Sequence, residues 1–354
     1  MGKINKISYE LRDIAVLQSP ISYQEHRGDV NPYTVTCGRK TLPIFVAPMA
    51  AVTDEKNYKI WIENKITPVI PRSVQNNLSI EERLKISQET FVSFSLSETK
   101  DMYVNGIIAQ HVDKLKPLHI CIDIAHGTLK SLYDICREIK HAFRESVVLM
   151  TGNIANPKAY EEYCRCGIDF CRFSVGSGSR CTSSCNVAVH IGLATLLDDV
   201  QEVKANMYRP RLDENPIFTE TKIIADGGIG WFDDIQKALV LGADYVMIGK
   251  MFAECEEACG PTSEMFVNGK CVPCRDYYGM STKRAQKITG GDGNKTSEGI
   301  SRPVEIKYPV KKLLDNVESY LRSCMTYTNS NTLSDLKKAE VVILGGSGDS
   351  SYRK

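Results

Sequence analysis

Eight short apolar runs alternate with longer segments of helical period, and this alternation constrains the fold more than any other feature of the sequence. The runs are rich in Val, Ile, Leu and Phe, as strands are when both faces of a parallel sheet are covered. Eight such units in series favour an α/β fold, a closed (β/α)8 TIM barrel, over a doubly wound open sheet. The expected strands are Pro43–Ala47, Thr67–Ile70, Phe91–Phe94, His119–Ile124, Val147–Thr151, Asp169–Val175, Lys222–Ala225 and Tyr245–Ile248.

Segments with the period and composition of amphipathic helices separate these strands. They include Ser79–Ser87, Ser131–Phe143, Asn156–Cys166 and Phe232–Leu241. Barrels of this class run from about 200 to 400 residues around one core. We therefore expect a single barrel domain over residues 1–344 and a flexible Gly/Ser-rich tail over residues 345–354.

Charge and composition exclude several classes of protein. The chain has 44 basic and 43 acidic residues and no basic stripe, so nucleic acid is not the expected partner. No run approaches the roughly 18 apolar residues of a membrane span. The 13 cysteines have irregular spacing and no apolar signal region accompanies them, which favours reduced thiols in a cytoplasmic protein.

The most informative loop is Val175–Ser184, which follows the sixth expected strand. Chemistry in this architecture sits on loops at the carboxyl ends of the strands. Gly176 and Gly178 allow a tight turn, and Cys181 would lie near a helix N-terminus, where the pKa of a thiol falls. The pattern favours Cys181 as a nucleophile; a tight loop with a bystander cysteine is the alternative.

Two further loops have the residues of a phosphate and ribose site. Asp226, followed by Gly227 and Gly228, ends the seventh strand, and Gly249-Lys250 ends the eighth. A carboxylate accepts hydrogen bonds from two ribose hydroxyls, and loops seven and eight are the usual phosphate site of a barrel. Lys250 either adds charge to that site or faces solvent.

Two other segments add candidate polar groups. In Tyr277-Tyr278-Gly279-Met280-Ser281, a tyrosine hydroxyl and backbone amides could complete a phosphate cradle. Asp123, after the fourth strand, suits a cofactor amide or ribose, whereas the nearby His126 is more simply a packing histidine.

In this order, the five segments resemble the inosine monophosphate dehydrogenase/guanosine monophosphate reductase family of (β/α)8 barrels. The resemblance runs from about Ile7 to Leu344 and implies that the partner is a purine nucleoside monophosphate. The motifs that carry it are Ala47-Pro48-Met49 with Val52-Thr53, Ala225–Ile229, Lys237-Ala238-Leu239 with Gly242–Gly249, Tyr278–Ser281 and Leu321–Met325.

The resemblance also implies roles for individual residues. Cys181 resembles the family nucleophile that adds to purine C2, and Ser183 and Glu298 resemble its proton relay. Substrate contacts are implied for Met49, Ser179, Asp226, Gly227, Gly228, Gly249, Lys250, Tyr278, Gly279, Met280, Ser281 and Gly299. Contacts to a nicotinamide cofactor are implied for Arg72, Asp123, Ile124, Ala125, Asn153 and Gly176. The carbonyls of Gly176, Gly178 and Cys181 resemble a potassium-type monovalent-cation site, and the family is usually homotetrameric.

Within the family, the sequence favours an NADPH-dependent GMP reductase (GMP to IMP). The dehydrogenase usually carries a regulatory (CBS) insertion after the second strand, but here Asn77–Thr90 runs directly into the third strand. It also has a flap with an Arg-Tyr pair, which is absent between Met280 and Glu298. In the dehydrogenase, the flap arginine acts as the base that activates water, and a positioned base typically contributes ~10²–10⁴-fold to the rate. Without it, the hydrolytic half-reaction should be poor. The alternative is an NAD-dependent IMP dehydrogenase (IMP to XMP) that lacks the CBS insertion.

Several departures indicate a divergent branch. Ser177 stands where the family usually has proline, Ser184 where a basic residue is common, and Arg72 where a lysine is common. A deoxy or modified purine monophosphate is therefore a possible substrate, and a nucleotide sensor without turnover is a third hypothesis.

One cysteine pattern suggests a different chemistry. Four cysteines have C-x3-C and C-x2-C spacings that could hold zinc, whereas the matching family segment is a metal-free hairpin. They are Cys255, Cys259, Cys271 and Cys274.

Overall fold

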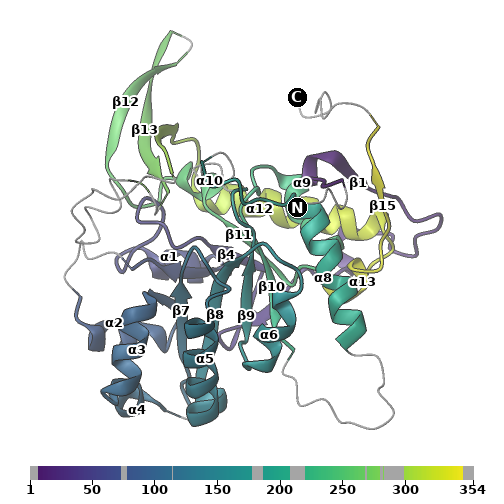
Figure 1. The fold of residues 1–354 in the computed structure, drawn as a ribbon. Helices are drawn as coiled ribbons and strands as arrows, with labels where there is room; N and C mark the ends of the chain where they lie inside the picture. The colour runs from purple at the N-terminus through teal and green to yellow at the C-terminus, as the bar shows by residue number, and fades with distance from the viewer. Residues whose placement is uncertain are drawn as a thin grey trace.

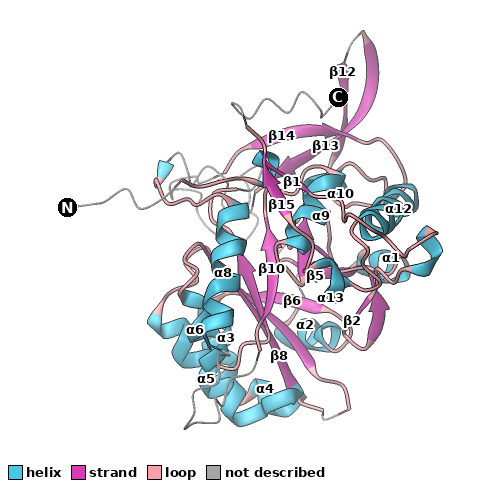
Figure 2. Ribbon diagram, turned by 90° about the vertical axis from the view of Figure 1, so that its right-hand side faces the viewer, coloured by secondary structure: helices cyan, strands magenta, loops and turns pink. Residues whose placement is uncertain are grey.

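Eight parallel strands close into one barrel in the computed structural model of this chain (Figures 1 and 2). The model describes residues 7–72, 78–113, 115–177, 186–207, 220–267, 269–279, 282 and 299–345. The barrel strands are β4 (Ile44–Val46), β5 (Thr67–Ile70), β6 (Phe91–Phe94), β7 (Leu118–Asp123), β8 (Val147–Ile154), β9 (Phe170–Phe173), β10 (Lys222–Asp226) and β11 (Tyr245–Ile248). Each strand pairs with the next along the chain, and β11 pairs with β4 to close the ring.

The predicted fold class is confirmed, and each of the eight expected strands overlaps an observed barrel strand. The largest differences lie at the ends of strands. β8 continues three residues beyond the expected end at Thr151, and β9 stops at Phe173, two residues before its expected end at Val175. The final residues of an expected strand can pass into the loop, because sequence pattern defines interiors better than boundaries.

Helices cover the outside of the barrel (Figure 1). The α-helices are α1 (Tyr58–Glu63), α2 (Ile80–Ser87), α3 (Leu96–Val104), α4 (Ile107–His111), α5 (Lys130–Phe143), α6 (Ala159–Arg165), α8 (Leu193–Met207), α9 (Phe232–Val240), α10 (Lys250–Ala253), α12 (Val310–Tyr327) and α13 (Leu333–Leu336). Short 3-10 turns are η1 (Leu11–Asp13), η2 (Arg27–Asp29) and η3 (Arg144–Ser146).

Local sequence explains where several helices begin and which face they bury. At the start of α2, Ser79 accepts a hydrogen bond from the Glu82 amide, and the Glu82 carboxylate accepts one from the Ser79 amide. Ser95 and Glu98 make the same exchange at the start of α3. Helix α5 buries one apolar stripe against the barrel, made of Leu132, Ile135, Cys136 and Ile139.

Aromatic rings fill the interior of the barrel. Phe45 makes contacts with Phe91, Phe170 and Tyr245, with ring centroids 5.0 to 5.8 Å apart. Such edge-to-face and tilted geometries add to the free energy gained from burial. The inside of the barrel is therefore a packed core, and any ligand site must lie at one of its ends.

Three small sheets outside the barrel were not predicted. β1 (Ile14–Val16) pairs with β15 (Val341–Ile343), so segments near the two ends of the described chain lie side by side. β2 (Thr34–Thr36) and β3 (Arg39–Thr41) form a hairpin. β12 (Thr262–Val267), β13 (Lys270–Tyr278) and β14 (Ser301–Glu305) form an antiparallel sheet, whose β12–β13 hairpin projects away from the barrel (Figures 1 and 2).

In the described part of the chain, no helix combines the length and apolarity needed to cross a bilayer.

The barrel interior predicts a contrast between two phenylalanines. Phe45 is 0% exposed within the aromatic core, and Phe266 is 75% exposed near the tip of the β12–β13 hairpin. We expect Phe45→Ala to lower the free energy of unfolding by about 3–5 kcal/mol, because it leaves a cavity. Phe266→Ala, the matched control, should change it by less than ~0.5 kcal/mol. Urea titration followed by circular dichroism measures both, and equal midpoints would contradict the packing described.

Candidate active site

A cleft of about 1230 Å³ opens at the carboxyl ends of the barrel strands. Every barrel strand except β6 contributes a described lining residue, either from its own end or from the loop that follows it. Small-molecule pockets are usually about 300–1,000 Å³. The cleft is therefore large enough for two ligands side by side.

Most of the predicted site residues that the structure describes line this cleft. They are Met49, Arg72, Asp123, Ala125, Asn153, Gly176, Asp226, Gly227, Gly228, Gly249, Lys250, Gly279 and Gly299. Residues that are far apart in sequence are thus brought to one mouth, as the barrel rule requires.

Two predicted residues do not line the cleft. Ile124 packs partly buried against the core, and its amide donates to the carbonyl of Gly152. The side chain of Tyr278 is 1% exposed, while Tyr277 lines the cleft instead. The expected contact of the Tyr278 hydroxyl with a ligand in the cleft is therefore corrected, because neighbouring strand residues point to opposite faces.

The remaining predicted residues lie outside the described residues. They are Gly178, Ser179, Cys181, Ser183, Met280, Ser281 and Glu298. Ser177 and Val187, which lie on either side of residues 178–185 in the sequence, both line the cleft.

Arg172, on β9, lies between two of the predicted acidic residues. Its Nη1 donates to Oδ1 of Asp123 at 2.7 Å. Its Nε and Nη2 lie 2.9 and 2.8 Å from Oδ2 of Asp226. The Arg172 residue is only 6% exposed. Burial alone would lower the pKa of its guanidinium, but Asp226 and Asp123 outweigh that effect and hold the pKa well above its usual value.

The two carboxylates are oriented differently by their partners. Oδ2 of Asp226 also accepts from the Asn153 side-chain amide at 2.7 Å. Oδ1 of Asp226 has no partner among the described residues, so it can accept hydrogen bonds from a ligand. Oδ2 of Asp123 lies 3.5 Å from Nε of Arg72. Two arginines and two aspartates therefore form a balanced charge network across the cleft floor.

Glycines permit the close packing that this network needs. Gly152 lies on β8 at φ +145°, and a Cβ there would come within 2.5 Å of the Arg172 carbonyl oxygen. At Gly249, a Cβ would lie 2.7 Å from the Tyr277 hydroxyl and 2.8 Å from the Met49 sulfur. A side chain at Gly152 would collide with Arg172 of the network, and one at Gly249 would collide with Tyr277 and Met49 in the cleft wall.

The loop after β10 presents two glycines to the cleft, whereas the backbone amides of the next residues are already used within the protein. Gly227 and Gly228 have φ of +99° and +75°, where glycine is strongly favoured. The amides of Gly230 and Trp231, by contrast, both donate to Oδ2 of Asp234. An anion at this loop would therefore meet the glycine backbone rather than the start of α9.

Sequence reasoning missed several lining residues. Arg172 could have been noticed as a charged residue inside an apolar run. His190 and Glu10 had no such signal: Nε2 of His190 lies 2.8 Å from Oε1 of Glu10, and its Nδ1 lies 3.0 Å from the Val175 carbonyl oxygen. These contacts join the N-terminal segment to the root of the loop that contains Cys181.

The four cysteines considered for zinc do not form a metal site. The Cys255 thiol faces the Met251 carbonyl, the Cys259 thiol faces that of Ala50, and Cys271 is exposed on the projecting hairpin. Burial, with the charge of Asp54, raises the pKa of Cys259 to about 12. Among the described residues, no group of three or more His, Cys, Asp or Glu could hold a metal ion.

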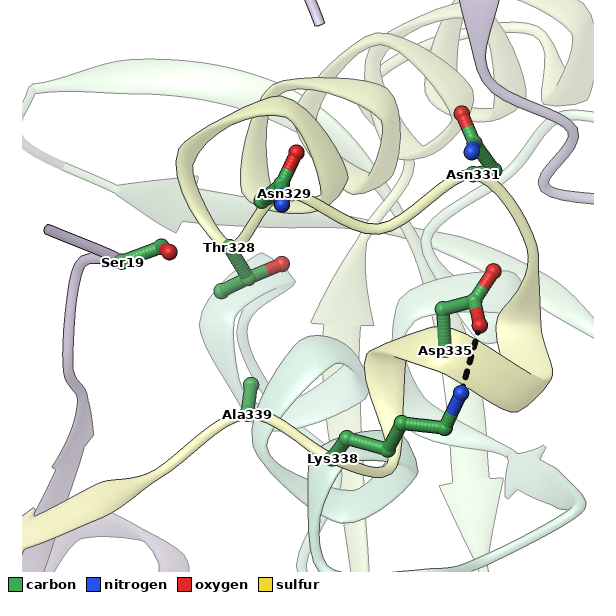
Figure 3. A pocket seen from close by; sticks show the side chains of 7 residues that line it. All are labelled: Ser19, Thr328, Asn329, Asn331, Asp335, Lys338 and Ala339. Atoms are coloured by element: carbon green, nitrogen blue, oxygen red, sulfur yellow. Dashed lines mark hydrogen bonds and ion pairs between the residues drawn. The ribbon is translucent and has the colours of Figure 1, made fainter. Parts of the chain in front are cut away.

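A second pocket, of about 320 Å³, lies between the N-terminal arm and the segment after α12 (Figure 3). Its polar groups already bond to the fold. Lys338 pairs with Asp335 at 2.9 Å, and Oδ1 of the Asn329 side chain accepts from the Tyr23 backbone amide. This pocket supports the packing of the arm, and nothing in it indicates a ligand.

Comparison with known proteins gives a consistent result. The model of the IMP dehydrogenase / GMP reductase domain matches residues 77–350. A GMP reductase of Oceanobacillus iheyensis is 29% identical over 323 residues, covering 89% of each chain. A GMP reductase of Clostridium acetobutylicum is 30% identical over 315 residues, covering 88% of this chain and 89% of its own. One from Staphylococcus carnosus is 28% identical over 310 residues, with 87% and 88% covered.

The packing of β8 against β9 predicts the effect of adding one methyl group. In Gly152→Ala, the new Cβ would meet backbone of Arg172 and keep a φ that L residues rarely adopt. We expect the variant to lose about 1–3 kcal/mol of folding free energy. Gly28→Ala is the control, since a Cβ there meets nothing within 4 Å. Thermal unfolding measures both, and an unchanged Gly152→Ala midpoint would refute the close approach.

Proposed function

The chain belongs to the IMP dehydrogenase / GMP reductase family, and from this premise we propose that it catalyses the NADPH-dependent reductive deamination of GMP to IMP through a covalent Cys181–purine intermediate. Membership makes it a purine nucleotide oxidoreductase of the GMP reductase type. The observation that carries the finer proposal is the carboxylate of Asp226. Its Oδ2 accepts hydrogen bonds from Arg172 and Asn153. Its Oδ1 has no partner among the described residues and is open to a ribose.

The residues at the cleft fit a nucleotide beside a dinucleotide. Asp226 would accept the ribose hydroxyls of GMP, and the backbone at Gly228 and Gly249 would face its phosphate. Asp123 and Asn153 lie together near the same floor, where an amide-bearing nicotinamide could be held. The remaining substrate contacts implied by the resemblance are Ser179, Met280 and Ser281, which lie outside the described residues.

The proposed reaction balances without an added oxidant. The Cys181 thiolate adds to C2 of the purine, and the 2-amino group leaves as ammonia after Ser183, paired with Glu298, has passed a proton to it. A bound NADPH would supply the hydride for C2. The C–S bond breaks as IMP forms, and the electron pair returns to Cys181 as thiolate.

We also propose a monovalent-cation site, which takes no part in the chemical steps given above. The carbonyls of Gly176, Gly178 and Cys181 would hold it. Of these, only Gly176 belongs to the described residues, and it lines the cleft.

Two features favour a reductase over a dehydrogenase. Residues 71–90 are all that separates β5 from β6, and α2 occupies much of that length, which leaves no room for an inserted domain. The relatives named above are GMP reductases. We further propose a cytoplasmic homotetramer built from one barrel domain over residues 1–344, as the resemblance implies.

Turnover tests the proposal directly. Wild-type enzyme mixed with GMP and NADPH should consume the near-ultraviolet absorbance of the reduced nicotinamide and release ammonia. Cys181→Ala should lower kcat by roughly 10⁴- to 10⁶-fold, because the nucleophile is lost. NADH formation from IMP and NAD would instead identify a dehydrogenase. Ligand binding without hydride transfer in either direction would identify a sensor.

The open oxygen of Asp226 predicts selectivity for the ribose. Wild-type enzyme should use GMP in preference to 2′-deoxy-GMP by roughly 10- to 100-fold in kcat/KM, the value of a hydrogen bond to a charged group. In Asp226→Asn, the ratio of kcat/KM for GMP to that for 2′-deoxy-GMP should fall to about three or less. Asp315→Asn, on the exposed face of α12, is the control and should retain the wild-type ratio. Equal ratios in wild type and Asp226→Asn would remove Asp226 from the ribose site.

A further inference from the structure

We propose that Arg172 is a positioning residue that couples nucleotide binding to dinucleotide binding across the cleft. This inference rests on the proposed function, in which Asp226 binds the ribose of the nucleotide and Asp123 lies beside the nicotinamide. Neither the resemblance nor the comparisons assign a role to Arg172. Its contacts assign it one.

The geometry of the guanidinium joins the two sites. Two nitrogens of Arg172, Nε and Nη2, lie 2.9 and 2.8 Å from Asp226, and the third, Nη1, lies 2.7 Å from Asp123. A guanidinium is a rigid planar fork, so its three nitrogens move together. A shift of one carboxylate must therefore move the other or break a charge-assisted hydrogen bond.

The network continues beyond the two carboxylates. The Asn153 amide donates to the same oxygen of Asp226, and Arg72 lies 3.5 Å from the far oxygen of Asp123. All of these residues line the cleft, so each end of the network can be contacted by a ligand. Arg172 itself is almost entirely enclosed, which limits screening of its ion pairs by water.

The sign of the coupling follows from the cost of ordering the network. Hydroxyls of a nucleotide that bind the open Oδ1 of Asp226 fix that carboxylate, and the guanidinium and Asp123 are fixed with it. A dinucleotide that binds afterwards meets an Asp123 that the first ligand has already fixed, so its binding no longer includes the entropic cost of fixing that side chain. Each ligand should therefore raise the affinity for the other by the same factor.

Lysine at this position would keep the charge and lose the fork. A single ammonium cannot hold both carboxylates in one plane, so Arg172→Lys should retain one contact at a time. The variant separates charge from geometry, which truncation of the side chain would not do. Truncation would also leave two unpaired carboxylates at the cleft floor and could prevent folding.

The experiment measures binding rather than turnover. GMP with NADP⁺ is an unreactive pair, because the oxidised nicotinamide has no hydride to give. Titration calorimetry gives the Kd of NADP⁺ with and without saturating GMP, and the ratio of these constants is the coupling factor. We expect a factor of roughly 5 to 150 in wild type. In Arg172→Lys the coupling factor should fall to about 1. The Kd of each ligand alone should change by a much smaller factor than the coupling factor does.

A matched control separates this effect from a general cost of replacing arginine. Arg83 is also held in an ion pair, 2.7 Å from Glu98, and it lies outside the cleft lining. Arg83→Lys is thus the same chemical change elsewhere, and it should keep the wild-type coupling factor.

A second variant keeps the test decisive if Arg172→Lys does not fold. Asp123→Asn preserves shape and removes the charge that pairs with Nη1 of Arg172. It should leave the Kd of GMP alone within about threefold, and saturating NADP⁺, whose binding to the variant is measured separately, should no longer change that Kd. A coupling factor that stays at the wild-type value in either folded variant would overturn the proposal, as would a wild-type factor of 1.

Failure of the proposed function would look different. If wild-type protein binds neither GMP nor NADP⁺, the proposed function is wrong. If it binds both and the two constants are independent, only the coupling through Arg172 is wrong.

Discussion

The two carboxylates at the barrel mouth can coexist because a buried guanidinium lies between them. Asp123 ends β7 and Asp226 ends β10, two strands that are separated in the barrel by β8 and β9, and both residues line the same cleft. Without Arg172 they would face each other as like charges with no cation between them. With it, both can remain acceptors. The open oxygen of Asp226 and the placement of Asn153 follow from the same set of hydrogen bonds.

This network explains why the backbone around it is so restricted. β8 approaches β9 closely enough that Gly152 has no space for a side chain beside Arg172. Ser174, directly after β9, is buried and has a φ of +145°, a conformation that non-glycine residues rarely adopt. Strain of this kind is usually found where a surrounding structure fixes a functional geometry. Here it occurs at the root of the loop that continues toward Cys181.

The fold could be predicted from the sequence because buried parallel strands leave a strong local pattern, and eight of them leave few ways to close. The small outer sheets could not. β1 and β15 are three residues each and lie at opposite ends of the chain, so nothing local indicates that they pair. Candidate loops were also predictable, since the carboxyl end of every barrel strand faces one side. Which side chain within a candidate segment faces the cleft was harder to predict. Tyr277 and Tyr278 are chemically equal neighbours, and only the register of β13 with β14 decides between them. Arg172 was overlooked because a charged residue inside an apolar strand resembles an interruption of the pattern, unless its two acidic partners from other strands are known.

The pairing of β1 with β15 has a consequence for how the protein is made. Glu10, Leu11 and Arg12 form part of the cleft wall and immediately precede β1, whose partner lies at Val341–Ile343. The Leu344 amide also donates to the carbonyl of Asp13. During translation, β1 therefore leaves the ribosome before its partner strand has been made, and the two can pair only after all eight barrel strands have been synthesised. This part of the cleft wall is completed after the barrel, although its residues are made before it.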